Sequence, residues 1–270
     1  LNPNTRFKRV FLVYYEFSMA GVIVKVDNLK KRYGNKTVVK GISFDVKKGE
    51  IFGILGPNGA GKTTALEMIE AMRSIDDGSV LLNSIDVAKK PEAVKQIIGV
   101  QLQSSAFMDK LNLTELLNLF GSLYGKKVHP VKLLSQVQLV DKRNSFFKTL
   151  SGGQKQRFSI ATALVNKPKV LFLDEPSTGL DPQARRNLWD LIKKIRNDDI
   201  TIILTSHYME EAQILCDRVA IMDNGKIITL DSPKKLIKNL LARGFKKEVK
   251  VEQADLEDVF IDLTGKELRN

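Results

Sequence analysis

The sequence predicts an α/β fold built on a mostly parallel sheet. Two short segments, 169–176 (KVLFLDEP) and 200–207 (ITIILTSH), are almost continuously apolar, as expected of strands buried on both faces of a sheet. Between them, residues 182–195 carry the spacing of an amphipathic helix. Because strands that alternate with helices usually pair in parallel, this order predicts an α/β core.

Shorter patterns predict the remaining elements. Strands are expected over 22–28, 41–46, 50–55 and 97–103, and helices over 62–72 and 151–165. Residues 112–140 show helical periodicity that is broken at Gly121, Gly125 and Pro130, which indicates a helical subdomain inserted in the larger domain. The last thirty residues predict one strand, 249–253, and one short helix.

Length and composition limit the class of protein. The chain has 270 residues, which suits one large domain or one domain with a subdomain. Its net charge of +12 suggests a polyanionic neighbour (a nucleotide, a nucleic acid or anionic lipid), with surplus lysine for solubility as the alternative. The single cysteine, Cys216, excludes an intrachain disulfide and lies in an apolar stretch, so we expect a buried, reduced thiol in a cytosolic setting.

The N-terminal residues stand apart from this pattern. No apolar run reaches the length of about 20 residues that a membrane span needs. Residues 1–18 are apolar and basic, but Glu16 interrupts them and no small-residue cleavage site follows, so they do not resemble a signal peptide. We expect a non-native or flexible extension before Met19, with a basic, aromatic arm that touches a membrane as the alternative.

A glycine-rich run, GPNGAGKTT, joins the predicted strand 50–55 to the predicted helix 62–72. It matches the phosphate loop G-x-x-x-x-G-K-[ST], in which backbone N–H groups and a helix N-terminus surround nucleotide phosphates. We expect Lys62 to place its charge between the outer phosphates, Thr63 to offer a hydroxyl to Mg²⁺, and Thr64 to support the neighbouring phosphate. The other residues of the predicted site are Gly56, Pro57, Asn58, Gly59, Ala60 and Gly61.

Two adjacent carboxylates end the apolar strand 169–176. Burying them without a cation is costly, and a metal-bound triphosphate would remove that cost. We therefore expect Asp174 to hold Mg²⁺, directly or through water, and Glu175 to orient or deprotonate the attacking water. Two acids simply exposed at a strand end are the alternative.

His207 ends the second apolar strand. If the two strands are neighbours, this histidine lies at the same sheet edge as Asp174, where it can contact the terminal phosphate and position the water. The predicted catalytic residues are therefore Lys62, Glu175 and His207. The other histidine, His129, has no such context and is given no role.

A pentapeptide, LSGGQ at 150–154, narrows the class of nucleotide triphosphatase. Together with GPNGAGKTT, LFLDEP, STGLD and the late histidine, it resembles the ATP-binding-cassette (ABC) transporter ATPases, from about Leu29 to the C-terminus. The resemblance implies a P-loop NTPase core with a mostly parallel sheet, an N-terminal antiparallel β subdomain and an inserted α-helical subdomain at about 104–165. The whole of 19–270 would be one ATPase domain.

The resemblance also implies roles for individual residues. Tyr33 matches the family's adenine-stacking aromatic residue, with an ordinary surface tyrosine as the alternative. Gln103 matches the glutamine that senses Mg²⁺, although Gln101 lies two residues away and this assignment can slip. Asp181 matches the loop that crosses the dimer interface. The signature that contacts the phosphates from the other subunit is matched by Ser151, Gly152, Gly153 and Gln154.

The implied partners follow from this assembly. Two chains arranged head to tail can enclose two ATP molecules, so an ATP-dependent homodimer or heterodimer is expected. The branch that energises drug, lipid or polysaccharide exporters is the most similar, which implies a separate membrane-spanning permease, export, and a place at the cytoplasmic face of the membrane. Candidate docking residues are Phe107, Met108, Leu111 and Leu113.

Two other functions compete with this one. A soluble cassette ATPase that acts on ribosomes or nucleic acid would suit the charge of +12. However, such proteins usually carry two cassettes or a long coiled coil, whereas this chain has one phosphate loop, and its basic residues lack interleaved aromatic residues, so no nucleic acid is expected. A non-hydrolysing binding module is disfavoured because Glu175 and His207 are both present.

Overall fold

The computed structural model describes residues 21–101, 107–196 and 199–245. The chain divides into two compact units, residues 1–234 and 235–270. The predicted extension before Met19 and the predicted strand 249–253 lie outside the described residues. No helix of the described ranges has both the length and the apolar character needed to cross a membrane.

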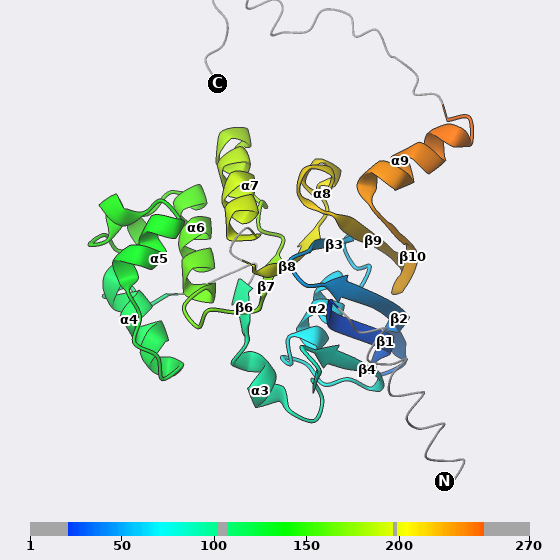
Figure 1. Ribbon diagram of the computed structural model, residues 1–270, viewed down its shortest axis with the longest axis horizontal. Helices are drawn as coiled ribbons and strands as arrows, with labels where there is room; N and C mark the ends of the chain where they lie inside the picture. Colours follow the sequence, from blue (N-terminus) through cyan, green and yellow to red (C-terminus); the bar gives the residue numbers. More distant parts are fainter. Residues whose placement is uncertain (1–20, 102–106, 197–198, 246–270) are drawn as a thin grey trace, which may run out of the picture. The chain divides into compact units, whose positions relative to one another are not determined.

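A six-stranded sheet forms the centre of the first unit (Figure 1). Its strand order is β10-β9-β3-β8-β7-β6, in which β10 is antiparallel to β9 and the other neighbours pair in parallel. The strands are β3 (Ile51–Leu55), β6 (Ile98–Gln101), β7 (Val170–Asp174), β8 (Thr201–Ser206), β9 (Arg218–Asp223) and β10 (Lys226–Asp231). Every residue of β3, β7 and β8 is buried, which explains why these segments are so uniformly apolar.

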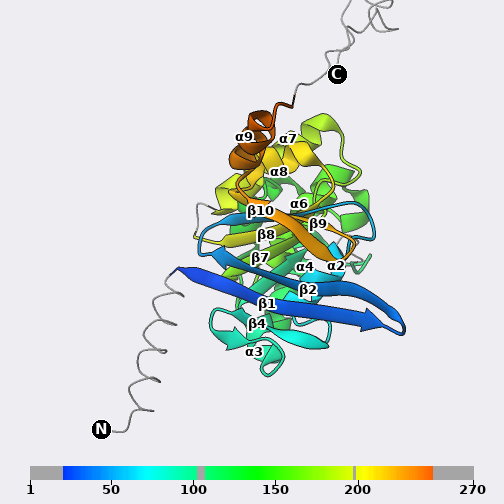
Figure 2. The same ribbon diagram turned by 90° about the vertical axis from the view of Figure 1, so that its right-hand side faces the viewer.

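A second, four-stranded antiparallel sheet is built from the N-terminal part of the chain, and its long strands β1 and β2 lie at the front of Figure 2. Its strands are β1 (Val22–Tyr33), β2 (Lys36–Lys47), β4 (Asp77–Leu82) and β5 (Ile85–Asp86). Helix α2 (Lys62–Ile69) joins the two sheets, because Leu66 and Met68 share one apolar core with Val24 of β1 and Phe172 of β7. The helix that follows the phosphate loop is therefore fixed on both sides.

The remaining helices lie between or after the strands along the chain. They are α3 (Pro91–Lys95), α4 (Leu113–Leu123), α5 (Pro130–Gln136), α6 (Gly152–Ala163), α7 (Pro182–Arg196), α8 (Met209–Leu215) and α9 (Pro233–Ala242), with 3-10 turns η1 (Val140–Lys142) and η2 (Phe147–Thr149). Helices α4, α5 and α6 gather beside the sheet (Figure 1). Phe107 joins this group, since its ring centroid lies 5.8 Å from that of Phe120 and 5.3 Å from that of Phe158.

The predicted helix break at Gly121 is wrong, whereas the breaks at Gly125 and Pro130 are confirmed. Gly121 lies inside α4, and a Cβ built on it would come within 2.8 Å of the carbonyl oxygen of Lys126. The chain turns back over the last turn of α4 at this point, so the glycine is needed for close approach rather than for termination. Gly125 adopts a φ of 64°, and Pro130 is the first residue of α5.

Candidate functional site

The glycine-rich loop runs from the end of β3 to the start of α2, the strand–loop–helix order that the motif requires. Two of its glycines cannot be replaced without displacing backbone. A Cβ on Gly56 would lie 2.2 Å from the carbonyl oxygen of Met222, and a Cβ on Gly61, whose φ is 97°, would lie 2.9 Å from that of Val38. Backbone segments of the same chain therefore pack closely against the loop at both of its ends.

Lys62 lies against this loop with its charge turned inward. Its Nζ donates to the carbonyl oxygens of Gly56 at 2.9 Å and Pro57 at 3.2 Å, and the residue is only 5% exposed. The same Nζ lies 3.7 Å from Oε1 of Glu175. A buried cation is thus held in place between the loop and a carboxylate, where phosphate oxygens can replace the carbonyl contacts.

Thr205 of β8 fixes the two carboxylates that end β7. Its hydroxyl donates to Oδ1 of Asp174 and accepts a hydrogen bond of 3.0 Å from the backbone N–H of Glu175. Burial raises the pKa of Asp174, and the hydrogen bond from Thr205 opposes that rise. The strand pairing of β7 with β8 therefore determines where both carboxylates lie.

Glu175 and His207 meet across the ends of these two strands, and the pairing of β7 with β8 places His207 at the same sheet edge as Asp174, as the sequence predicted. His207 Nδ1 lies 3.2 Å from Oε2 of Glu175, and the same oxygen accepts a hydrogen bond of 3.2 Å from Thr178 Oγ1. Glu175 has a φ of 47°, a left-handed conformation that costs a non-glycine residue conformational energy. A side chain held in this way is well suited to present a carboxylate to a bound water.

The loop and these strand ends surround one cavity of about 580 Å³. This volume lies within the range of about 300–1,000 Å³ that is common for small-molecule sites. Its lining brings together residues predicted from three separate motifs. The lining residues are Val38, Asn58, Gly59, Gly61, Lys62, Thr63, Thr64, Glu175, Thr178 and His207.

The side chains beside this cavity also fit a divalent cation. Thr63 Oγ1 lies 3.4 Å from Oδ2 of Asp174, so a hydroxyl and a carboxylate face one another next to the loop. Mg²⁺ is commonly held by one or two carboxylates together with substrate phosphates and water, so a larger group of protein ligands is not needed. A cation here would also offset the cost of burying Asp174, which is 6% exposed.

The signature residues lie elsewhere, at the N-terminus of α6. Ser151 Oγ accepts the N–H of Gln154 at 3.4 Å, and Gln154 Oε1 accepts the N–H of Ser151 at 3.0 Å, which together form a capping box. Asp181 similarly accepts the N–H of Ala184 at 2.8 Å at the start of α7. Within the described residues, no signature residue lines the cavity beside Lys62.

Two predicted nucleotide contacts remain predictions. Tyr33, at the end of β1, is 41% exposed, and its ring centroid lies 5.4 Å from Cζ of Arg73, so its face is already used by a cation. Gln103 lies outside the described residues, whereas Gln101, its neighbour in the prediction, is buried at the end of β6.

Residues that the sequence analysis did not single out support the site from behind. Glu70, directly after α2, is 2% exposed, and burial, with smaller contributions from Asp174 and Glu67, raises its pKa to about 8. As a charged residue of the predicted helix 62–72, it gave no signal of burial. Thr205 gave only a weak signal, as the first polar residue near the end of an apolar strand.

A buried hydrogen-bonded group links the segments that follow the two strands. Ser177 Oγ donates to Oε1 of Glu211, while Nε1 of Trp189 lies 3.1 Å from both of these oxygens. Ser177 and Glu211 are fully buried, and Trp189 is 4% exposed, so this group lies in the core. Ser177 lies two residues after Glu175 and Glu211 lies four after His207, so the group ties together the two segments that carry the site.

Comparison with known proteins identifies the family. The model of the family described as ABC transporter matches residues 39–178, which is more than half of the chain. The chain belongs to the ABC transporter family. It therefore binds and hydrolyses ATP, and the P-loop NTPase fold predicted from its sequence is confirmed.

Three known proteins show the extent of the similarity. The linearmycin resistance ATP-binding protein LnrL of Bacillus subtilis (strain 168) is 40% identical over 223 residues, which cover 81% of this chain and 72% of LnrL. The Nod factor export ATP-binding protein I of Ralstonia nicotianae is 40% identical over 220 residues, covering 80% and 68%. The solved dimeric structure of the ATP-binding cassette MJ0796 bound to ADP and Pi has a TM-score of 0.70 at 25% identity, covering 77% and 98%.

Proposed function

We propose that this ABC ATPase drives export through a separate membrane-spanning subunit. The observation that carries the proposal is the single cavity in which the phosphate loop, Glu175 and His207 face one another. Family membership supplies the nucleotide, and the name of the Nod factor export relative supports the direction of transport. The ribosomal or nucleic-acid alternative has no comparable support, since both curated relatives are named for resistance or export.

The chain's own residues divide the chemistry between them. Lys62 and the loop N–H groups hold the phosphates, and Thr63 and Asp174 would hold Mg²⁺. When bound, that ion supplies charge neutralisation at the phosphate oxygens. Glu175 orients and deprotonates the attacking water, while His207 fixes the position of the Glu175 carboxylate and lines the space for the terminal phosphate.

The signature residues complete this site from a second chain. A helix N-terminus that begins with serine and two glycines attracts phosphate, yet within the described residues Ser151–Gln154 do not line the chain's own cavity. The dimeric state of the MJ0796 cassette supports a head-to-tail pair, in which each loop faces the partner's signature. ATP bound between the two chains would then hold them together, and hydrolysis would release them.

The membrane-spanning partner would dock near the segment that follows β6. Of the four apolar residues predicted there, Leu113 is fully buried and Phe107 packs among other aromatic rings, so both belong to the core. Met108, by contrast, is 61% exposed and remains a candidate contact. A peripheral place at the cytoplasmic face of the membrane follows from this docking.

Mixing two inactive variants tests the composite site. Lys62→Ala removes the phosphate-loop cation, and Ser151→Asp adds a charge that repels phosphate while it still caps α6. In a mixed dimer, one site combines both defects and the other is intact. We expect each variant alone to be inactive and the mixture to recover about a quarter of the parent ATPase rate, because half of randomly formed dimers are mixed and each has one intact site.

The matched control is Ser151→Asn, which also caps α6 but adds no charge. We expect this variant to retain most of the parent rate, which would show that the charge and not the helix cap is responsible. A mixture of Lys62→Ala and Ser151→Asp that stayed inactive, although the chains co-sedimented as dimers with ATP, would contradict the shared site. Stable co-purification of a multispanning membrane protein with the parent chain tests the transporter role separately.

A further inference from the structure

A second cavity, distinct from the nucleotide site, lies at the opposite end of the central strands. It has a volume of about 840 Å³ and is formed by the segment after α4, by α5, by the turn between α6 and β7, and by Ile200 just before β8. The phosphate site lies at the other ends of β7 and β8. The five residues of β7 separate the two sites by about 13 Å, so a ligand here would not touch the nucleotide.

The charges around this cavity are all of one sign. Lys126, Lys127, Lys132 and Lys167 line it together with His129, whereas no acidic residue of the described ranges does. Nor do Lys127, Lys132 and Lys167 form an ion pair within those ranges, although lysines elsewhere in the chain do so. The positive charge here therefore lacks internal compensation and favours an anionic ligand.

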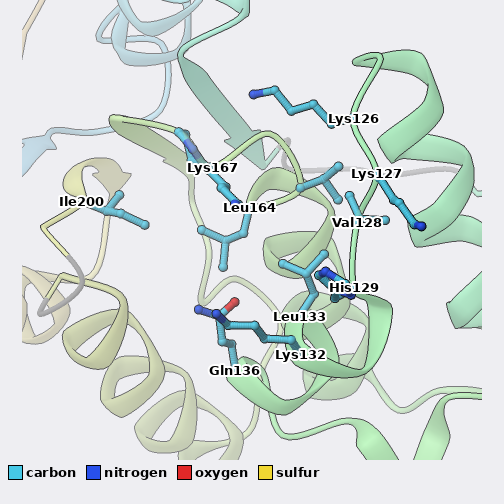
Figure 3. A pocket seen from close by; sticks show the side chains of 12 residues that line it. Lys126, Lys127, Val128, His129, Lys132, Leu133, Gln136, Leu164, Lys167 and Ile200 are labelled. Carbon is cyan, nitrogen blue, oxygen red and sulfur yellow. The ribbon is translucent and has the colours of Figure 1, made fainter.

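Apolar side chains separate these charges. Figure 3 shows Lys126 and Lys167 toward one end of the cavity and Lys132 toward the other, with Leu164, Val128 and Leu133 between them. A hydrated inorganic ion would leave that middle section unused. A ligand with an apolar body and an acidic group at each end would match both the walls and the two charged ends.

Two features of the turn between α6 and β7 indicate a built site rather than a random group of surface lysines. Lys126 Nζ is fixed by a hydrogen bond of 2.5 Å to the carbonyl oxygen of Asn166, whose own side-chain amide donates to the carbonyl oxygen of Ile98 at 2.6 Å. Lys167 adopts a φ of 54°, which is in the left-handed region. Glycine or asparagine would adopt that conformation at lower cost, so a lysine at this position carries a conformational penalty.

We propose that this cavity binds a small, water-soluble organic dianion whose two acidic groups flank an apolar body. Its position, away from the nucleotide and from the strand ends that carry Glu175 and His207, makes it a site for a regulatory ligand rather than for a substrate of hydrolysis. The ligand would hold α5 of the helical subdomain against the turn that leads into β7.

The fluorescent binaphthyl disulfonate bis-ANS is a suitable probe, because it carries two sulfonates on an aromatic body. We expect the full chain, with its nucleotide site saturated by Mg²⁺ and a non-hydrolysable ATP analogue, to bind one equivalent of the dye. The triple variant Lys127→Gln, Lys132→Gln, Lys167→Gln should bind it at least about tenfold more weakly. Its ATPase rate without dye should stay within about twofold of the parent, because the loop is intact.

The matched control removes three lysines of the N-terminal sheet and its following turn, through Lys36→Gln, Lys47→Gln and Lys48→Gln. These residues are also exposed, and their loss changes the net charge by the same amount. Equal weakening in both triple variants would overturn the proposal, since it would reveal a response to net charge alone. Unchanged dye binding in the cavity variant would overturn it as well.

Two further measurements fix the class of ligand and the role of the backbone. A naphthalene monosulfonate should bind at least about tenfold more weakly than the matching disulfonate, and equal binding would contradict a dianion site. Lys167→Gly should weaken dye binding while raising the melting temperature, because it removes a charge and relieves the backbone. The alternative is that these lysines bind anionic lipid, which phosphatidylglycerol vesicles would test. Vesicle binding that depends on the lysines and is not competed by the disulfonate would overturn the soluble ligand in favour of a membrane.

Discussion

Two regions of this ATPase are proposed to contact ATP, the phosphate-loop end and the signature end, and they are built in opposite ways. At the phosphate loop, the side chains of Lys62 and Glu175 are largely buried, and Lys62 Nζ lies 3.7 Å from Oε1 of Glu175. At the signature, Ser151 is exposed, and its side chain and backbone N–H take part in the cap of its own helix. The first end brings the residues proposed for catalysis together within one chain, whereas the second is a helix N-terminus that we propose meets ATP bound to a partner chain.

The largest expected effect comes from the loop. Lys62→Ala should abolish ATP binding or reduce turnover by at least about a thousandfold, because it removes the cation that faces the phosphates and leaves Glu175 beside an uncompensated site. Binding of a fluorescent ATP analogue and single-turnover hydrolysis would measure the two effects. Retention of both at the parent level would show that the loop end is not the active end.

Glu175→Gln separates chemistry from binding. Because glutamine cannot accept a proton, we expect turnover to fall by about a hundredfold or more while ATP affinity stays close to that of the parent. The stalled variant should form a dimer on addition of ATP, detectable by size-exclusion chromatography with light scattering. Hydrolysis by this variant at the parent rate would remove Glu175 from its proposed role.

Glu70 tests how deeply the loop end is buried. Its pKa is raised to about 8, so the folded state holds the proton more tightly than the unfolded state. The stabilisation from this group is complete below a pH of about 4.5 and is lost as the pH rises towards 8, by about 1.4 kcal/mol for each pKa unit. Urea titrations should show a steeper fall in unfolding free energy between pH 5 and 8, on the order of a few kcal/mol, for the parent than for Glu70→Gln.

The smallest effect is expected from the loss of the helix cap at the signature. Ser151→Ala removes the cap of α6 and should lower the free energy of unfolding by about 1 kcal/mol, with Ser151→Asn restoring it. Both the parent and Ser151→Asn would serve as references in the same denaturant titration. A loss as large as that expected for Glu70 would mean that this helix end is integrated in the fold as firmly as the loop, which would remove the contrast between the two ends.

The sequence predicted those elements whose burial can be recognised from their own residues. Strands β7 and β8 are buried on both faces, so their apolar composition identified them and placed Asp174, Glu175 and His207 at one edge. Strands β4, β5, β9 and β10 were not predicted, because they are short, partly exposed or lie at sheet edges where polar residues are accepted. The residue type alone gave no sign of the edge pairing.

Buried polar groups were the other failure of prediction, for a different reason. Glu70 and Glu211 look like ordinary surface residues of helices, yet both are almost completely buried. Their burial depends on contacts from elements far away in the chain, such as the indole N–H of Trp189, which reaches Glu211 from α7. The hydrophobic periodicity and composition of a helix predict which of its faces is apolar. They do not predict which side chain from a distant part of the sequence will form a hydrogen bond with a polar atom on that helix.

At Glu175, whose backbone is left-handed, selection for stability and selection for activity favour different residues. With a φ of 47°, this position would fold at lower cost as glycine or asparagine, so substitutions that stabilise the chain are available where we propose that the carboxylate is needed for turnover. A library of this protein screened only for thermal stability would therefore enrich inactive members at position 175. Selection for heat resistance, without an assay of ATP hydrolysis, would therefore favour loss of this carboxylate.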